Sequence, residues 1–292
     1  MNILITGVEQ FIGNAIARFF SQQGYSIIPY TFSSQSNVEL PSLCKKQQIQ
    51  TIIHAADVPQ ISFIDSLLNC IELCSIPYMI FCSSADVYGI PTTEYVEEKQ
   101  KRNPITKYGI YKKEIEEQVE AFSLRYPLTN IAVLRLFNVT GADPVRNIGP
   151  VYQGNTDFMI RLMRSFANRK IKFVFYGDDY LTPDGYPIRD FIHIIDVCEA
   201  IERILINIST QPIPYIEYNI GTSEGNSLSH IVNRASEVLQ MPIHTTVQSR
   251  KEDEVARLVA DINRMKLLFN WKPRYPLDQS ILTTWQWCVK QM

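Results

Sequence analysis

The sequence lacks a long apolar run, a strong net charge and any pairing pattern among its cysteines. No apolar stretch in its 292 residues approaches the roughly 18 residues that form a membrane-spanning helix. The apolar run at the N-terminus is short and has neither a basic flank nor a cleavage site, so no signal peptide is predicted. The net charge of -2 gives no reason to expect binding to nucleic acid or to an anionic membrane.

The six cysteines suggest neither a disulfide framework nor a metal site. They form no Cys-x-x-Cys pair and no cluster with the histidines. Cys70 and Cys74 are four residues apart in a helical pattern, which favours packing in a core. We therefore expect a reduced, cytoplasmic protein that binds no metal.

The composition is that of an ordinary globular protein, with 46% apolar and 20% charged residues. In the first half, short apolar strands alternate with amphipathic helices. Strands are predicted at residues 1–6, 25–30, 51–56, 78–83 and 131–137, and helices at 11–20, 42–50, 61–74 and 103–122. This alternation predicts right-handed βαβ units, and hence an α/β fold with a doubly wound parallel sheet.

The pattern changes after Asn138. Residues 141–155 and 173–188 are predicted to be mainly loop, because both segments contain several proline and glycine residues. Helices are predicted at 158–167, 196–206, 228–239 and 262–269, and a strand at 215–220. The second half therefore predicts a smaller lobe that is interleaved with the sheet.

A glycine turn follows the first strand. Residues 6–13 read Thr-Gly-Val-Glu-Gln-Phe-Ile-Gly, between an apolar strand and an amphipathic helix. A dinucleotide-binding fold has its phosphate-binding turn at this point, with a third glycine between the other two. Here Gln10 occupies the place of that middle glycine.

Two further motifs follow in the order that a nucleotide-dependent enzyme would need. Ser83 and Ser84 end a predicted strand, and ligands bind at that edge of an open α/β sheet. Tyr108 and Lys112 are four residues apart in a predicted helix, so they share one face. An ammonium beside a phenol favours the phenolate and makes Tyr108 a candidate acid or base, although such a pair is often only part of an exposed helix face.

Together, these motifs resemble those of the extended short-chain dehydrogenase/reductases, the NAD-dependent sugar-nucleotide epimerases and dehydratases. The resemblance covers nearly the whole chain. The most specific piece is Asp184 to His193, read with Tyr176 to Tyr180, which is similar to UDP-galactose (UDP-glucose) 4-epimerases more than to the dehydratases. Other pieces that carry it are residues 134–141, 218–221, 260–261, 269–273 and 283–285.

The resemblance implies a catalytic set and two binding sites. Ser84, Tyr108 and Lys112 would be catalytic. Asn138 and Arg189 would bind the diphosphate of a UDP-sugar, because the planar guanidinium can meet phosphate oxygens in pairs. The remaining implied substrate residues are Phe158 and Tyr176 beside the base, with Lys251 and Glu254 in the basic-acidic stretch.

The implied cofactor is NAD, with NADP not excluded. It would lie against Gly7, Gln10, Phe11, Ile12, Gly13, Thr31, Ala55, Ala56, Ser83, Tyr108 and Lys112. The implied domains are a dinucleotide-binding domain at 1–140 plus 187–222 and a sugar-nucleotide-binding lobe at 141–186 plus 223–292. We expect Arg250 to be either a surface charge or a ligand, and His193 to pack structurally.

Four features depart from the family pattern. Gln10 replaces a glycine, and the second strand is followed by no acid for the adenosine ribose and no basic residue for a 2′-phosphate. The chain between that strand and Thr51 is short, as if one βα segment were missing, an economy that resembles the 4-ketoreductases. Phe63 falls near a position where the epimerases have a cofactor-contacting Asn. These departures predict a loosely held cofactor.

The function that this resemblance implies is NAD-dependent epimerisation at C4 of a UDP-hexose through a transient 4-keto sugar. Three alternatives stay open: a 4-ketoreductase, a decarboxylase or dehydratase, and a non-catalytic sugar-nucleotide binder. Ala85 and Asp86 stand where dehydratases have an acidic pair, so only one of the two acids for the elimination of water is present. Asp86 alone resembles the arrangement of the decarboxylases. A homodimer could form through the helix at 112–122, although its charges equally predict an exposed face.

Overall fold

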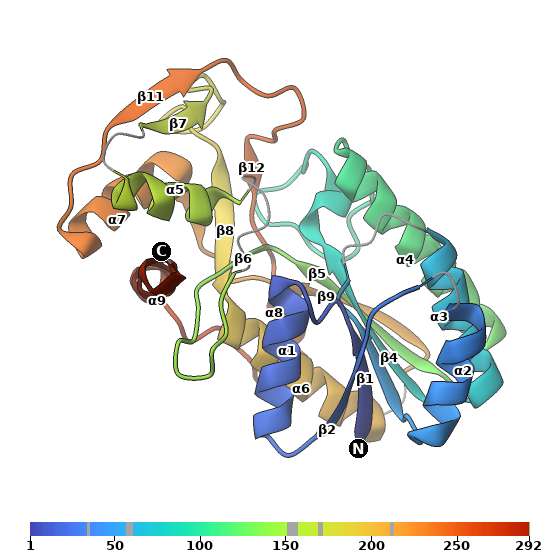
Figure 1. Ribbon diagram of the computed structural model, residues 1–292. Coiled ribbons are helices and arrows are strands. Elements are labelled where there is room, and N and C mark those ends of the chain that lie inside the picture. The colour runs from blue at the N-terminus through green and yellow to red at the C-terminus, as the bar shows by residue number, and fades with distance from the viewer. Residues whose placement is uncertain (34–35, 57–60, 151–156, 169–171, 211–212, 292) are drawn as a thin grey trace.

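The computed structural model describes residues 1–33, 36–56, 61–150, 157–168, 172–210 and 213–291. Its centre is a sheet of six parallel strands in the order β2-β1-β3-β4-β5-β9 (Figure 1). These strands are β1 (Asn2–Thr6), β2 (Ser26–Tyr30), β3 (Thr51–His54), β4 (Tyr78–Ser84), β5 (Asn130–Leu136) and β9 (Tyr215–Ile220). The predicted α/β class and parallel sheet are confirmed.

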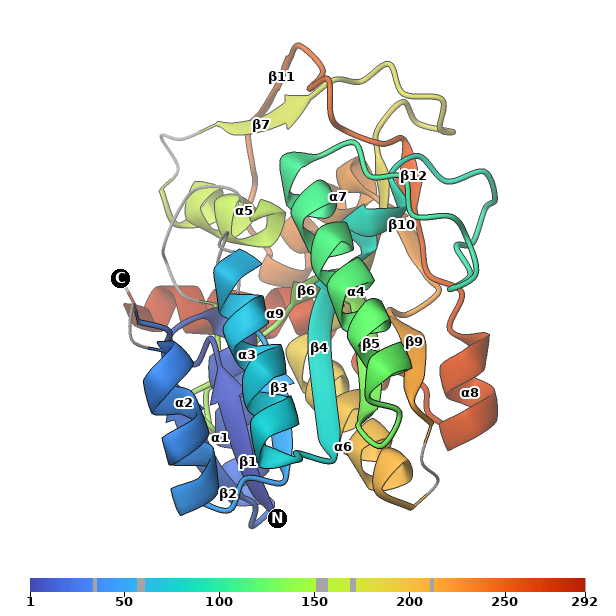
Figure 2. The same cartoon turned by 90° about the vertical axis from the view of Figure 1, so that its right-hand side faces the viewer.

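Helices cover both faces of the sheet. The helices α1 (Phe11–Gln22) and α6 (Ile194–Thr210) lie on one face, and α2 (Ser36–Lys46), α3 (Ile61–Cys74) and α4 (Lys107–Arg125) lie on the other (Figure 2). Alternate side chains of one strand therefore enter different cores: Ile3 and Ile5 join the first, and Leu4 joins the second. Burial on both faces explains why the strands read as continuous apolar runs.

The sheet ends at β2, which is its edge strand. A doubly wound sheet in the order 3-2-1-4-5-6 has another strand beyond the second one. Among the described residues no strand lies beyond β2. The short connection between Tyr30 and Thr51 thus corresponds to the missing βα segment that the sequence predicted.

The smaller lobe is built on short strands and three helices. The strands β6 (Asn138–Thr140), β10 (Gly225–Ser227) and β12 (Arg257–Leu258) surround β8 (Ile188–His193), while β7 (Phe173–Tyr176) pairs with β11 (Thr245–Gln248). A third apolar core lies beneath them, formed with the helices α5 (Phe158–Ala167), α7 (Leu228–Leu239) and α9 (Leu277–Gln291). In Figure 1 this lobe stands above the carboxyl ends of the sheet strands.

The packing refines the predicted division into domains, which we keep as a proposal. The helix α8 (Asn263–Phe269) and its flanking residues lie in the segment assigned to the smaller lobe. Yet Leu258, Met265 and Trp271 are buried in the core of the sheet face that carries α1 and α6. The C-terminal segment therefore crosses from the smaller lobe to the sheet and back.

The starts of two predicted helices were wrong by several residues. The helix α4 begins at Lys107 rather than near Asn103, because the Thr106 hydroxyl accepts a hydrogen bond from the backbone N–H of Gly109 and caps the helix. The helix α2 begins before Pro41 rather than after it. In α2, the packing of Leu40 and Cys44 against α3 outweighs the cost of a proline inside a helix.

The remaining general predictions concern cysteines and membranes. All six cysteines are free thiols, and Cys70 is fully buried, as core packing predicts. In the part of the chain that the structure describes, no helix has the length and apolarity to cross a bilayer.

Candidate active site

The three predicted catalytic side chains meet in one cavity. Ser84 is the last residue of β4, and Tyr108 and Lys112 lie in the first two turns of α4, which packs against β4. All three line a cavity of about 560 Å³ at the carboxyl edge of the sheet. The edge position is where ligands bind in open α/β folds.

Lys112 is held in place by the strand beneath it. Its side chain is only 2% exposed, and its ammonium Nζ donates a hydrogen bond to the carbonyl oxygen of Cys82 at 3.1 Å. The same Nζ lies 5.4 Å from the ring centroid of Tyr108, which is 40% exposed. A buried cation therefore lies beside an accessible phenol, an arrangement that stabilises the phenolate.

The two serines at the end of β4 have different partners. The Ser84 hydroxyl oxygen accepts a hydrogen bond from the backbone N–H of Asp86 at 3.2 Å and caps the short helix η1 (Ala85–Tyr88). The Ser83 hydroxyl donates to the buried carboxylate of Glu116 at 2.5 Å. Ser84 is therefore the hydroxyl better placed for a ligand, while that of Ser83 ties β4 to α4.

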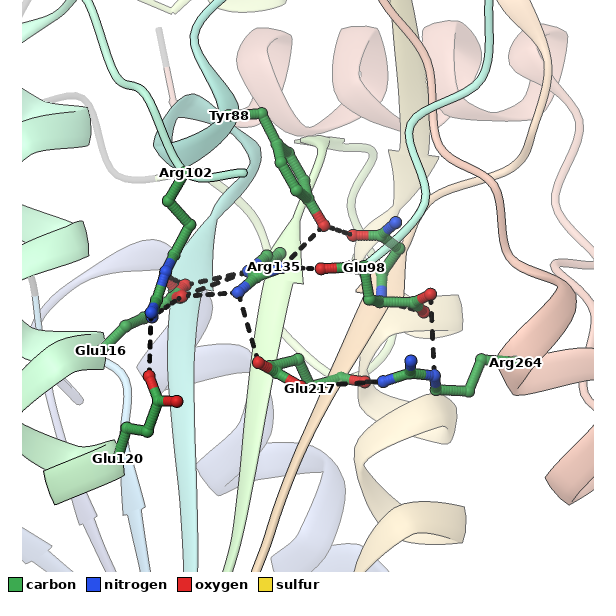
Figure 3. Close-up of polar contacts among 10 residues, drawn as sticks. Tyr88, Glu98, Arg102, Glu116, Glu120, Arg135, Glu217 and Arg264 are labelled. Atoms are coloured by element: carbon green, nitrogen blue, oxygen red, sulfur yellow. Dashed lines mark hydrogen bonds and ion pairs between the residues drawn. The ribbon is translucent and has the colours of Figure 1, made fainter. Parts of the chain in front are cut away.

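Glu116 belongs to a buried polar network, which Figure 3 shows. It is fully buried and receives ion pairs from Arg135 on β5 at 2.8 Å and from Arg102 at 3.1 Å. The sequence suggested that the charges of this helix form an exposed face. That expectation was wrong for Glu116, because cations from a neighbouring strand and loop meet it in the interior.

Arg135 connects the network to the loop after η1. It donates to the backbone carbonyl of Glu98 at 2.7 Å and to the Tyr88 hydroxyl at 3.0 Å. Tyr88 in turn donates to the side chain of Asn219 on β9 at 2.6 Å. The network thus joins β4, α4, β5 and β9, and Glu116 follows Lys112 by four residues on α4.

The glycine turn packs closely on the residues that follow β3. Gly7 has a φ of +76°, and a Cβ at this position would lie 2.7 Å from the backbone of Ala55. A Cβ on Gly13 would lie 2.2 Å from the carbonyl oxygen of Gly7. Both positions therefore require glycine, as do the first and third glycine positions of a dinucleotide-binding turn. The turn thus fits the implied dinucleotide cofactor.

Gln10 fits the turn without backbone strain. Its φ of -105° is extended, and it precedes α1 as the N-cap residue. Its side chain lines the cavity, as do Phe11 and Ile12. The missing middle glycine therefore changes what faces the cavity, while the conformation of the turn tolerates a side chain.

The predicted cofactor residues divide into three groups. Those that line the cavity are Gln10, Phe11, Ile12, Ala55, Ser83, Tyr108 and Lys112. Gly7, Gly13 and Ala56 are buried. Thr31 lies just beyond β2, and its hydroxyl donates to Glu9 at 3.5 Å. Three acids that line the cavity, Glu9, Asp86 and Asp157, were not among the predicted site residues. The sequence reasoning sought an acid only after the second strand and weighed Asp86 only for alternative reactions.

A second, smaller cavity of about 200 Å³ lies in the other lobe. It is lined by six of the predicted substrate residues, namely Asn138, Phe158, Tyr176, Arg189, Lys251 and Glu254. These residues come from β6, α5, β7, β8 and the loop after β11, so only the fold brings them together.

Aromatic and cationic groups form the walls of this second cavity. Two cations lie near the Tyr176 ring, the Arg161 guanidinium carbon at 5.2 Å and the Lys251 ammonium at 4.6 Å from its centroid. Arg189 pairs with Glu254 and donates to the carbonyl oxygen of Val255 at 2.5 Å. Arg161 was missed by the sequence reasoning, because a basic residue inside an amphipathic helix carries no special signal.

The two cavities share part of their lining. Asn138 and Asp157 face both of them. Asp157 caps α5 by accepting from the backbone N–H of Ile160 at 2.8 Å, and burial raises the pKa of its carboxyl. A ligand that extends from one cavity into the other would pass these two side chains.

Arg250, His193 and Asp86, which the sequence also singled out, each contact a neighbouring side chain. Arg250 stacks on Tyr180 at 3.9 Å outside both cavity linings. His193 is buried and stacks on Tyr275 at 4.2 Å, a packing role as predicted. Asp86 accepts from the Thr106 hydroxyl at 3.4 Å, and burial raises its pKa although Arg189 opposes the shift.

Comparison with known proteins gives the family and the fold of this chain. The sequence model of the "NAD dependent epimerase/dehydratase family" matches residues 3–221. A UDP-glucose 4-epimerase of Yersinia enterocolitica is 27% identical over 329 residues, covering 98% of this chain and 97% of that protein. Among solved structures, a UDP-glucose 4-epimerase from Brucella ovis in complex with NAD has a TM-score of 0.91 at 25% identity, over 98% of each chain. A UDP-glucose 4-epimerase from Stenotrophomonas maltophila, with bound NAD and formylated UDP-arabinopyranose, has a TM-score of 0.94 over 100% and 98% of the two chains. At 24% identity, this last likeness is one of fold.

Proposed function

This chain belongs to the NAD dependent epimerase/dehydratase family, and from that membership we propose that it inverts C4 of a UDP-hexose through a transient 4-keto sugar. NAD is its cofactor, and when bound it supplies the hydride acceptor and donor for the reaction. The single observation that carries the proposal is the junction of the two cavities at Asn138 and Asp157. One cavity contains an acid–base pair and the other contains cations beside an aromatic wall.

In the proposed reaction each residue in the larger cavity has one task. Tyr108 takes the proton of the C4 hydroxyl as its phenolate and later returns it. The Lys112 ammonium places a positive charge beside that phenol, and it is itself fixed by the Cys82 carbonyl. The Ser84 hydroxyl hydrogen-bonds the same sugar oxygen and so directs it toward Tyr108.

In the smaller cavity, the UDP moiety meets groups of complementary chemistry. Tyr176 offers a flat face to the base, and Lys251 and Arg161 place positive charge beside it for the diphosphate. Arg189 lines the same cavity, but its donors already bind the segment that contains Glu254. We therefore assign Arg189 two roles, shaping the loop and adding charge to the diphosphate site.

The proposal is tested by offering purified protein a panel of UDP-sugars and following C4 configuration by NMR. The panel contains UDP-galactose, UDP-N-acetylgalactosamine and UDP-glucuronate. We expect at least one of them to equilibrate with its C4 epimer, and the Tyr108→Phe variant to lose that activity. A protein that holds NAD and UDP but equilibrates none of these sugars would contradict the proposal and favour the non-catalytic binder or the 4-ketoreductase.

A second candidate function is decarboxylation of a UDP-uronate, and Asp86 is the observation that favours it. Its carboxyl lines the same cavity as Ser84 and Tyr108. The related dehydratase reaction is less well supported. Ala85, which is buried, supplies no second acid for the elimination of water. Release of carbon dioxide from UDP-glucuronate, or accumulation of a 4-keto-6-deoxy sugar, would displace the epimerase proposal.

The 4-ketoreductase alternative rests on the absent βα segment beyond β2 in the described chain. It predicts that the reduced cofactor is oxidised when a 4-keto substrate is added, whereas an epimerase leaves the cofactor unchanged after each turnover. Two predictions from the sequence stay proposals: a cytoplasmic location, and a homodimer formed through α4. Sedimentation analysis tests the second.

A further inference from the structure

The end of β2 lacks the acid that would bind the adenosine ribose. In dinucleotide-binding folds this acid follows the second strand and hydrogen-bonds the ribose 2′-hydroxyl. Here β2 ends at Tyr30 and continues as Thr31-Phe32-Ser33. The Phe32 ring stacks on Phe63, with centroids 4.7 Å apart and planes at 12°. This strand end therefore offers a hydroxyl and aromatic rings, and no carboxylate of its own.

A carboxylate reaches the same place from the glycine turn. Glu9 is the residue before Gln10, and both line the larger cavity. The Thr31 hydroxyl donates to the Glu9 carboxylate oxygen Oε2 at 3.5 Å. Both side chains are exposed, so this long hydrogen bond can be exchanged for one from a ligand hydroxyl without uncovering a buried charge.

We propose that Glu9 is the acid that binds the adenosine ribose of NAD, and that its charge selects NAD against NADP. The geometry places a carboxylate over the end of β2 and beside the pyrophosphate turn. A ribose 2′-hydroxyl can donate to this carboxylate. A 2′-phosphate would instead meet a like charge, and residues 7–13 and 31–33 contain no Lys or Arg to balance it.

A second acid near β2 provides a matched control. Ser33 donates to the Glu39 carboxylate oxygen Oε2 at 3.4 Å, in the same way as Thr31 donates to Glu9. Glu39 is also exposed, but of these two acids only Glu9 lines the cavity in the described part of the chain. A general effect of surface charge would act through both acids, and a direct contact with ribose only through Glu9.

The test compares NAD and NADP binding to the full-length protein by calorimetry at fixed ionic strength, with no sugar nucleotide present. Glu9→Gln should weaken NAD binding about tenfold, the worth of one hydrogen bond to a charged group, and should lower the preference for NAD over NADP. Glu39→Gln should leave both affinities unchanged. Because the assay contains no substrate, its outcome is independent of the proposed epimerase activity.

A rescue variant separates a ribose contact from damage to the turn. Adding Thr31→Asp to Glu9→Gln returns a carboxylate to the strand end and should restore most of the preference for NAD. The proposal is wrong if Glu9→Gln keeps the wild-type ratio of NAD to NADP affinity. It is also wrong if Glu39→Gln lowers that ratio equally, or if the carboxylate added in the double variant restores none of it.

Discussion

Replacing Arg135 with Met should destabilise the protein severely, because it leaves the fully buried Glu116 short of a partner. Arg135 contributes the ion pair at 2.8 Å and two further Nε hydrogen bonds at 3.2 Å to that carboxylate. Removing one member of a buried ion pair costs about 3–5 kcal/mol. Arg102 and Ser83 still hold Glu116, so we expect the lower end of that range, about 3 kcal/mol.

The assay is urea denaturation, followed by both circular dichroism and tryptophan fluorescence so that separate unfolding of the two lobes is detected. Arg102→Met is the control, because its side chain is 19% exposed and Arg135 would still pair with Glu116. It should cost about 1 kcal/mol, as a partly exposed pair does. The double variant Glu116→Leu/Arg135→Met removes the orphaned charge and should be more stable than Arg135→Met alone.

Two results would refute this reasoning. One is an Arg135→Met variant that loses less than about 1 kcal/mol, the value of an exposed pair. The other is a double variant whose loss equals the sum of its two single losses, since residues coupled in one network do not add. Either outcome would mean that water or another group satisfies Glu116 when Arg135 is absent.

Three further predictions concern Tyr108, Gln10 and His193. Tyr108→Phe should lower turnover by roughly 10²–10⁴-fold without loss of stability, and near-normal turnover would remove Tyr108 from the mechanism. Gln10→Gly should tighten NAD binding about tenfold, or about 1.4 kcal/mol, if the side chain holds the pyrophosphate away, and equal or weaker binding of NADH in a fluorescence titration would defeat that account. Burial lowers the pKa of His193 to about 4 from 6.5, so its contribution to stability is complete above pH 6.5 and is lost as the pH falls toward 4. His193→Gln should remove about 3 kcal/mol of that pH dependence, and identical pH–stability curves for the two proteins would contradict the burial argument.

The sequence was sufficient for several elements whose structure depends on neighbouring residues. The strand 215–220 and the helices 158–167 and 228–239 match the structure at both ends. The spacing of apolar residues and the capping residues that define such elements lie within or next to each segment. The helix α9 was missed, since its centre reads Thr283-Thr284-Trp285, residues of modest helix propensity. Its packing against α5 and α7 makes it helical, and no local signal predicts that.

In the candidate site, too, local features could be predicted from the sequence and contacts between distant segments could not. The spacing of Tyr108 and Lys112 is a local property, so the sequence alone could place them on one helix face. The depth of Lys112 depends on β4, whose Cys82 carbonyl lies 30 residues earlier in the chain. Glu116 is the clearest example. A charged residue on a charged helix is expected to be exposed to solvent. The structure instead buries Glu116, because the β4–β5 pairing brings Arg135 close to it.

Glu9 extends this argument from stability to specificity. A search along the sequence for the ribose acid looks after the second strand, where the fold usually has it, and there finds Thr31. The structure relates the two positions through space, because the turn after β1 and the end of β2 lie side by side in a parallel pair. A carboxylate absent from one of these adjacent segments can therefore be supplied by the other, although Glu9 and Thr31 are 22 positions apart in the chain. What a cofactor site requires is a charge at one point in space, and neighbouring strand ends offer more than one position in the sequence from which to supply it.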